Sequence, residues 1–124
     1  MNILFVCTGN TCRSPMAEGI TRALAAEQHK DVTTVSAGLF AAYGAKPTEQ
    51  AVEAVRSIAD ISDHESRPLT MELVNAADLI IGMTKDHKSV LLRFPSGVVK
   101  MVMLQTHMGL IKPYIINVRN KFIT

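Results

Sequence analysis

The chain has 124 residues and a net charge of +2, and 48% of its residues are hydrophobic while 19% are charged. This composition is typical of a compact globular protein and excludes a disordered chain, so we expect residues 1–124 to form a single domain. The two cysteines, Cys7 and Cys12, exclude a disulfide scaffold and favour a reducing, cytoplasmic setting. An apolar run follows Met1 directly, so we expect neither a signal peptide nor a membrane span.

The charges are unevenly distributed along the chain. Residues 1–86 carry 7 basic and 11 acidic side chains, whereas residues 87–124 carry 6 basic side chains and no acidic one. A basic segment can attract nucleic acid, but this one has neither interleaved aromatic residues nor a nucleic-acid-binding motif. We therefore interpret it as a basic surface and expect no nucleic-acid partner.

Short apolar runs alternate with stretches of helical spacing. The expected strands are residues 2–7, 32–36, 78–83 and 98–104. The expected helices are residues 14–27, 48–59, a short one after residue 70, and 84–94. This alternation predicts an α/β fold in which helices flank a parallel sheet. Ligands of such sheets bind beyond the carboxyl ends of the strands, where residues 7–14 lie.

Three hydroxyl residues are expected to cap helices. Ser14 precedes Pro15, whose fixed φ suits the first helical position. Thr48 and Thr70 stand in the same way before the second and third helices. The inner face of the second helix is expected to carry the apolar residues Ala51, Val52, Val55, Ile58 and Ala59.

The loop between the first strand and the first helix carries the chemistry. It reads Cys7-Thr8-Gly9-Asn10-Thr11-Cys12-Arg13-Ser14. A cysteine followed by five residues and an arginine is typical of a site where a thiolate attacks phosphorus. The helix N-terminus and Arg13 favour the thiolate of Cys7, and the backbone N–H groups of residues 8–13 can hold phosphoryl oxygens.

The remaining loop residues agree with this interpretation. Gly9 and Asn10 tolerate positive φ, Arg13 can bind two oxygens at once, and Ser14 can donate to the sulfur of Cys7. A structural cysteine would not require Arg13 and Ser14 at these spacings, and a zinc site would need four ligands. We therefore predict that Cys7 and Arg13 are catalytic, that residues 8–14 bind phosphate, and that the site uses neither a metal nor a cofactor.

Residues 6–18, which read VCTGNTCRSPMAE, resemble the amino-terminal signature of the low-molecular-weight protein tyrosine phosphatase family. The similarity continues through Ser36-Ala37-Gly38, Arg67-Pro68-Leu69, Ala77-Asp78-Leu79-Ile80 and Met83-Thr84, so that it spans residues 2–104. The resemblance implies a four-stranded parallel sheet, a phosphocysteine intermediate, phosphorylated protein substrates and no metal. It also implies that Asn10, Ser14 and Ser36 support the shape of the loop.

Thr11 and Phe40 bear on the substrate. Tyrosine-directed members of the family usually have a bulky aliphatic residue at the position of Thr11, whereas the protein-arginine-phosphatase branch has threonine. A hydroxyl can position a guanidinium where an aliphatic side chain would favour an aromatic ring. Phe40 fits a wall of the same pocket, with an ordinary loop anchor as the alternative. The resemblance therefore favours phosphoarginine over phosphotyrosine.

Cys12 has two interpretations. It can shield Cys7 by forming a disulfide under oxidation, as in family members with the same pair of cysteines. The alternative is a small buried hydrophobic residue. Arsenate-reducing relatives use further downstream cysteines, and none follows Cys12 in this chain, so we do not expect that activity.

The expected general acid is missing. Family members carry an Asp-Pro pair on a late loop, and the Asp protonates the leaving group and then activates water. The corresponding segment here is Gly109-Leu110-Ile111-Lys112-Pro113-Tyr114, so lysine replaces the Asp. Lys112 can donate a proton but regenerates poorly as a base, and His107 is a residue type that titrates near neutrality. Loss of a general acid typically lowers the rate by about 10²–10⁴.

Three interpretations of the function remain. The chain is a cysteine-dependent protein phosphatase impaired at its acid loop, a non-catalytic binder of phosphoresidues or phosphate, or a shortened version of an active enzyme. The chain ends ten residues after Tyr114, and we expect it to lack the C-terminal helix that covers one sheet face in the family. An uncovered face would expose an apolar patch, so we expect a monomer or weak self-association.

Overall fold

The computed structural model describes residues 1–83 in full. Beyond them it describes the backbone of residues 102–103, 105–107, 110–112, 115–116 and 122–123. The helices are α1 (Arg13–Glu27), α2 (Glu49–Val55) and α3 (Met71–Ala76). The strands are β1 (Asn2–Cys7), β2 (Thr33–Gly38), β3 (Leu79–Gly82), β4 (Val102–Met103), β5 (Gln105–His107), β6 (Leu110–Lys112), β7 (Ile115–Ile116) and β8 (Phe122–Ile123).

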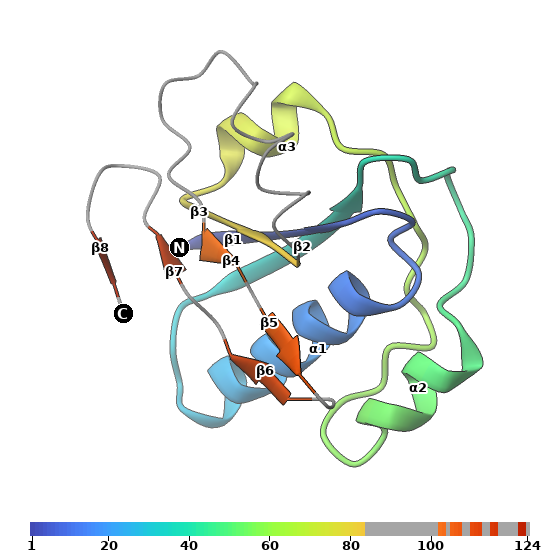
Figure 1. Cartoon of the computed structure of the whole chain (residues 1–124). Coiled ribbons are helices and arrows are strands. Elements are labelled where there is room, and N and C mark those ends of the chain that lie inside the picture. Colours follow the sequence, from blue (N-terminus) through green and yellow to red (C-terminus); the bar gives the residue numbers. More distant parts are fainter. Residues whose placement is uncertain (84–101, 104, 108–109, 113–114, 117–121, 124) are drawn as a thin grey trace.

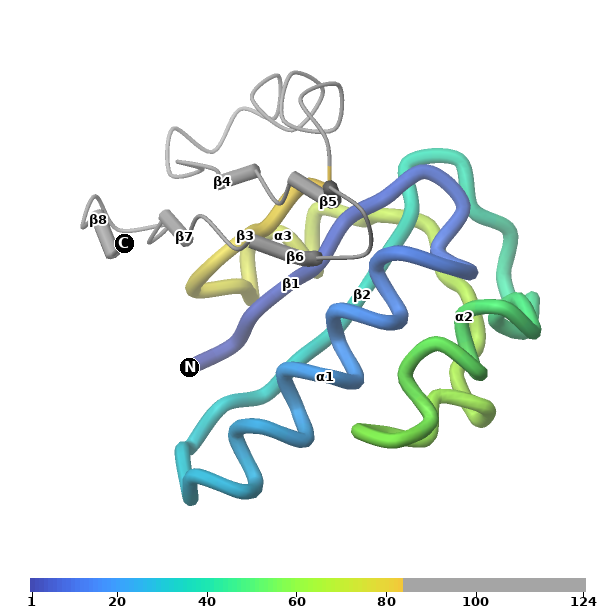
Figure 2. Tube along the Cα trace, turned by 60° about the horizontal axis from the view of Figure 1, so that its bottom comes forward, coloured from blue at the N-terminus to red at the C-terminus, as the bar shows by residue number. Residues whose placement is uncertain are grey.

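The central sheet has four strands in the order β2-β1-β3-β4, and each neighbouring pair is parallel. This arrangement confirms the predicted α/β class and the four-stranded parallel sheet. Helices α1 and α2 lie on one side of the sheet and α3 lies on the other (Figures 1 and 2). After β4, the described residues form two short antiparallel pairs, β5–β6 and β7–β8.

The side chains of β1 alternate between two hydrophobic clusters, as a strand buried on both faces requires. Ile3, Phe5 and Cys7 belong to the cluster that includes Ala17 of α1. Leu4 and Val6 belong to the opposite cluster, which includes Val74 of α3. The alternation directs the side chain of Cys7 to the face of the sheet that α1 covers.

The predicted helix caps are confirmed at two of three positions. The hydroxyls of Thr48 and Thr70 accept hydrogen bonds from the first turns of α2 and α3. The prediction for Ser14 is wrong, because α1 begins at Arg13 and Cys12 stands at the cap position without a side-chain cap. The hydroxyl of Ser14 bonds to the sulfur of Cys7 instead, so it is not available to a helix N-terminus.

Several boundaries also differ from expectation. Strand β2 extends to Gly38, because it pairs with β1 as far as Cys7. Helix α2 ends at Val55, and the N–H groups of Ile58 and Ala59 both donate to the Val55 carbonyl in a closing turn. The side chain of Ile58 is therefore 51% exposed rather than on an inner face. The predicted helix 84–94 and most of the predicted strand 98–104 lie outside the described residues.

Within the fully described part of the chain, no helix is long and apolar enough to cross a membrane.

Gly19 of α1 provides a test of the α1–α2 side of the fold. A Cβ at this position would lie too close to Cγ2 of Ile61 and 3.6 Å from Cβ of Ala59. In G19A, overpacking of about 1–3 kcal/mol opposes a helix-propensity gain of about 1 kcal/mol. We therefore expect the free energy of unfolding to fall, as measured by chemical denaturation.

The double variant G19A/I61A serves as the control for this test. G19A should lower the free energy of unfolding less in the I61A background than in the wild-type background, because I61A removes the methyl group that the new Cβ would contact. If G19A raised the stability of the wild-type chain, the proposed close packing would be contradicted.

Candidate functional site

Residues 8–12 connect the carboxyl end of β1 to the first turn of α1, so that Cys7 and Arg13 stand at the two ends of one tight loop (Figure 1). Cys7 is only 3% exposed, whereas Thr8 and Gly9 are exposed and Arg13 is half-buried. The backbone N–H groups at the start of a helix lack intrahelical partners. The loop therefore combines a cysteine, a guanidinium and free helix N–H groups in one place.

The sulfur of Cys7 is surrounded by hydrogen-bond donors. The N–H of Asn10 donates to it over 3.2 Å, and the hydroxyl of Ser14 lies 2.8 Å away. The Asn10 amide donates to the Ser14 oxygen over 2.8 Å, which leaves the hydroxyl hydrogen of Ser14 for the sulfur. Both contacts at the sulfur then come from donors, an arrangement that stabilises a thiolate.

Asn10 is the centre of the loop. It has a φ of 56° and an exposure of 0%, and its side-chain amide donates to Ser14 and, over 2.9 Å, to Ser36. Its side-chain oxygen accepts from the N–H of Arg67 over 2.9 Å. Its backbone carbonyl accepts from Nε2 of His64 over 2.8 Å. Every polar group of the side chain is thus satisfied in the interior, as burial requires.

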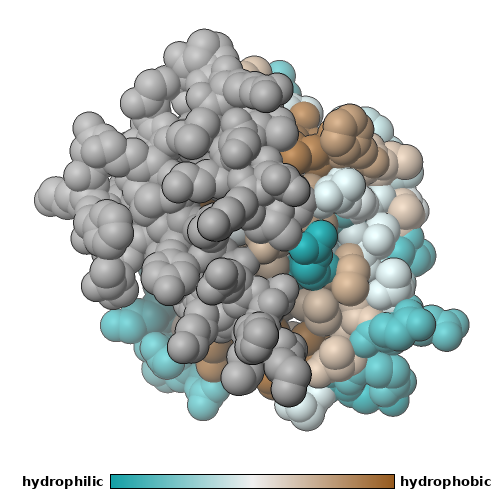
Figure 3. Space-filling model, viewed as in Figure 1, coloured by the Kyte–Doolittle hydropathy of each residue, from teal (hydrophilic) through white to brown (hydrophobic). Residues whose placement is uncertain are grey.

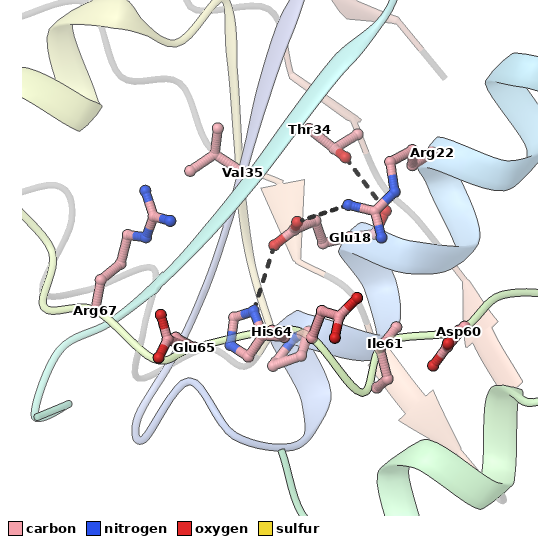
Figure 4. A pocket seen from close by; sticks show the side chains of 11 residues that line it. Glu18, Arg22, Thr34, Val35, Asp60, Ile61, His64, Glu65 and Arg67 are labelled. Atoms are coloured by element: carbon pink, nitrogen blue, oxygen red, sulfur yellow. Dashed lines mark hydrogen bonds and ion pairs between the residues drawn. The ribbon is translucent and has the colours of Figure 1, made fainter. Parts of the chain in front are cut away.

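A second layer of polar side chains lies behind the loop (Figure 4). Glu18 accepts from the Ser36 hydroxyl over 2.5 Å and pairs with Arg22 over 3.2 Å. Nδ1 of His64 lies 4.0 Å from the same carboxylate. Glu18, Arg22 and His64 line a pocket of about 460 Å³ between α1, β2 and the segment 60–67. The carboxylate of Glu18 therefore connects Ser36 and His64, two of the residues that hold Asn10.

The loop is also fixed from the outside. The N–H groups of Leu39 and Phe40 donate to the carbonyls of Cys7 and Thr8, each over 2.9 Å. Gly38 permits this close approach, because a Cβ there would lie 2.6 Å from the Thr8 carbonyl oxygen and 3.0 Å from the Asn10 nitrogen. Main-chain contacts consequently hold the segment after β2 against the loop of residues 7–14.

The loop reaches α2 through Thr11 and Cys12. The Thr11 carbonyl accepts from the N–H of Thr48 over 2.8 Å. Cys12 is half-buried and packs against the cluster of Ala51, Val55 and Ile61, as a small hydrophobic residue would. Cys7 and Cys12 are both free thiols in this structure.

The predicted site residues fall into three groups. The structure brings together Cys7, Asn10, Ser14 and Ser36 through the hydrogen bonds above. Phe40 lies next to the loop through its backbone, and its side chain is 85% exposed. Lys112 lies at the end of β6, where it pairs with Gln105, while Pro113 and Tyr114 lie outside the described residues. The arrangement of the Lys112 side chain relative to Cys7 stays a prediction.

The sequence indicated no role for Glu18 or Arg67. Glu18 lies one helical turn after Ser14, on the buried side of α1, and this spacing was the signal that could have identified it. His64 and Arg67 come from an irregular segment, so no periodic pattern marks them. Among residues 1–83, no group of three or more side chains is arranged to hold a metal ion.

Comparison with known proteins agrees with this geometry. Residues 2–118 match the family described as low molecular weight phosphotyrosine protein phosphatase. The protein-arginine-phosphatase of Bacillus subtilis (strain 168) is 47% identical over 91 residues, which cover 73% of this chain and 61% of the relative. That of Geobacillus stearothermophilus is 40% identical over 96 residues, covering 77% and 63%. The chain thus spans about three fifths of the length of these curated relatives.

Solved structures give the same result. The low molecular weight protein tyrosine phosphatase from T. tengcongensis has a TM-score of 0.75 at 42% identity, covering 82% of this chain and 72% of that one. The arginine phosphatase YwlE, solved as a cysteine-to-serine mutant with a phosphorylated active site serine, has a TM-score of 0.70 at 46% identity, covering 73% and 60%. By sequence and by fold, the chain belongs to the low molecular weight phosphotyrosine protein phosphatase family.

Proposed function

We propose that this chain is a cysteine-dependent phosphatase that removes the phosphoryl group from phosphoarginine on proteins. The observation that carries the proposal is the environment of the Cys7 sulfur, which receives hydrogen bonds from Asn10 and Ser14 at the N-terminus of α1. The phosphorylated active site serine in the YwlE mutant supports a nucleophilic role for the equivalent loop in that relative.

The proposed reaction proceeds in two steps. The Cys7 thiolate attacks phosphorus, so that an S–P bond forms while the bond from phosphorus to the leaving nitrogen breaks, and the leaving guanidine takes up a proton from solvent water. The loop N–H groups and the Arg13 guanidinium hold the three phosphoryl oxygens through the transition state. Water then attacks the phosphocysteine, phosphate is released, and the hydroxyl of Ser14 stabilises the departing sulfur.

Thr11 and the sequence relatives support phosphoarginine as the substrate. Two relatives are named protein-arginine-phosphatases. The Thr11 hydroxyl oxygen lies 3.7 Å from the position that a Cβ on Gly9 would take, so it stands above the exposed part of the loop. The exposed ring of Phe40 follows β2 at the same edge of the sheet and provides a planar surface for a guanidinium. Phosphotyrosine is the alternative substrate of the same pocket.

Lys112 supports a further proposal, that turnover is impaired. An ammonium group in place of the family's Asp cannot readily accept the proton of the attacking water, so hydrolysis of the phosphocysteine should be the slow step. If this step does not occur at all, the chain acts as a binder of phosphoresidues or phosphate. We propose that it works on phosphorylated proteins in the cytoplasm, as a monomer or in weak self-association, with no nucleic-acid or membrane partner.

The acid loop can be tested with an activated aryl phosphate in single-turnover and steady-state experiments. We expect a rapid burst of the phenol, a phosphocysteine detectable by mass spectrometry, and slow turnover. In K112D the steady-state rate should rise by about 10²–10⁴, because a carboxylate restores proton transfer. K112N is the matched control, since it removes the charge without supplying an acid or base.

Two results would contradict the acid-loop proposal. Fast turnover by the wild-type chain with no gain in K112D would mean that another group performs the proton transfers. Tight binding of the aryl phosphate without any phosphocysteine would favour the non-catalytic binder.

The substrate proposal can be tested at Thr11. The wild-type chain should dephosphorylate phosphoarginine peptides faster than matched phosphotyrosine peptides, as measured by phosphate release. In T11I the preference should shift toward phosphotyrosine, because a methyl-rich side chain packs on an aromatic ring and offers no hydrogen bond to a guanidinium. T11S is the control that keeps the hydroxyl. A wild-type preference for phosphotyrosine would refute the assignment.

Asn10 can be tested by binding of inorganic phosphate. In N10A the N–H of Arg67 loses its acceptor, at about 1–3 kcal/mol for a buried group left unsatisfied, while the hydroxyls of Ser14 and Ser36 each lose a donor but keep Cys7 and Glu18 as partners. We expect lower thermal stability and at least tenfold weaker phosphate binding by calorimetry. S36A should have the smaller effect, since it removes one contact of Asn10. Equal phosphate affinity in N10A and wild type would show that the network does not shape the loop.

A further inference from the structure

A second pocket lies beside the segment that follows β2. It has a volume of about 460 Å³ and is formed between the turn at Tyr43 and Gly44 and the chain from Glu65 to Leu73. It shares Glu65 and Arg67 with the pocket behind the loop, whose other walls are α1, β2 and residues 60–64. In Figure 3 brown, hydrophobic atoms gather toward the top of the described surface, where the segment after β2 and the chain before α3 lie. The pocket therefore borders an exposed apolar edge of the protein.

The turn that carries Tyr43 is held by one buried residue, Ser66. The Ser66 hydroxyl donates to the Ala42 carbonyl over 2.6 Å and accepts from the N–H of Ala45 over 3.0 Å. Its backbone exchanges two hydrogen bonds of 2.9 Å with Gly44 and Ala45. Tyr43 is nevertheless 77% exposed. The hydrogen-bonded backbone fixes where the ring emerges, and an aromatic side chain has few rotatable bonds to immobilise on binding, which suits recognition of a partner.

The chain around Ser66 also connects the pocket to the loop of residues 7–14. The residue after Ser66 is Arg67, whose N–H donates to the side chain of Asn10. On the opposite wall of the pocket, the chain also leads back to the loop. The N–H of Phe40 donates to the Thr8 carbonyl, and Phe40 lies four residues before Gly44. Four residues span at most about 14 Å. An extended peptide whose phosphorylated residue occupies the loop can therefore reach the pocket within about two to four residues.

The walls of the pocket suit an amphipathic cation. Tyr43, Pro68 and Leu73 supply aromatic and apolar surface, and Glu65 and Glu72 supply two carboxylates against the single guanidinium of Arg67. Within residues 1–83, none of these three charged side chains forms an ion pair. Lysine and arginine side chains pack their methylene stems on apolar surface while their charged ends reach carboxylates or an aromatic face.

We propose that this pocket binds a lysine or arginine side chain of the substrate protein, two to four residues away from the phosphorylated residue. The inference rests on the proposed function, because it needs a phosphoresidue in the loop. It adds a site for the flanking sequence, in which Tyr43 covers the methylene stem and Glu65 and Glu72 face the positive charge. The affinity of the enzyme for a substrate then depends on the charge of the residues beside the phosphorylation site as well as on the phosphoresidue itself.

Binding to the C7A variant of the 124-residue chain tests the inference without phosphoryl transfer, because alanine offers no nucleophile at this position. Fluorescence anisotropy would compare phosphoarginine peptides that carry lysine, glutamine or glutamate three residues away from the phosphoarginine and are otherwise identical. The lysine peptide should bind about threefold to tenfold more tightly than the glutamine peptide, and the glutamate peptide more weakly than both. Adding E72Q or E65Q should bring the lysine-to-glutamine ratio toward one.

Matched variants separate recognition from general effects. E53Q removes a carboxylate of α2 that is 62% exposed and lies outside the pocket, and it should leave the ratio unchanged. Y43F should keep the ratio because the ring remains, whereas Y43A should lower it. Equal affinity for all three peptides, or a ratio that E72Q and E65Q do not change, overturns this inference alone. If no phosphoarginine peptide binds C7A at all, the proposed function falls together with it.

Discussion

The burial of the Asn10 side chain is the constraint on which the rest of the site depends. A fully buried carboxamide needs partners for both of its donors and for its oxygen, and in this protein they come from α1, from β2 and from the segment before α3. The positive φ of Asn10 directs its own N–H toward the sulfur of Cys7. The same residue therefore closes the loop around the nucleophile and joins the loop to the surrounding fold.

The partners of Asn10 are themselves connected, which extends this constraint outward. Ser36 and His64 both face Glu18, so the carboxylate on α1 connects the edge strand β2 to the irregular segment 60–67. On the opposite side, Arg67 follows Ser66, which holds the turn at Tyr43. The chemistry of the loop and the exposed surface for a substrate's flanking residues are thus supported by one hydrogen-bonded segment.

The sequence predicted best where a single local rule decides the outcome. The buried strands and the caps at Thr48 and Thr70 follow from short-range patterns, and the structure has them. Ser14 shows how such a rule fails, because a hydroxyl that can cap a helix can also bond to a nearby sulfur, and here the sulfur is its partner. The prediction for Ile58 is wrong for a related reason. It assumed that the second helix continues past Ile58, but α2 ends three residues earlier, at Val55.

The amino-acid sequence by itself determined the chemical groups of the loop and the α/β class, and it predicted that Lys112 stands where the family has an Asp. These features are local, because each is read from neighbouring residues or from a repeating apolar pattern. Only the tertiary structure decided that Ser36, His64 and Arg67, which follow Asn10 by 26, 54 and 57 residues, would all form hydrogen bonds with Asn10. The parallel sheet brings these distant segments to one edge, and burial there makes each hydrogen bond necessary.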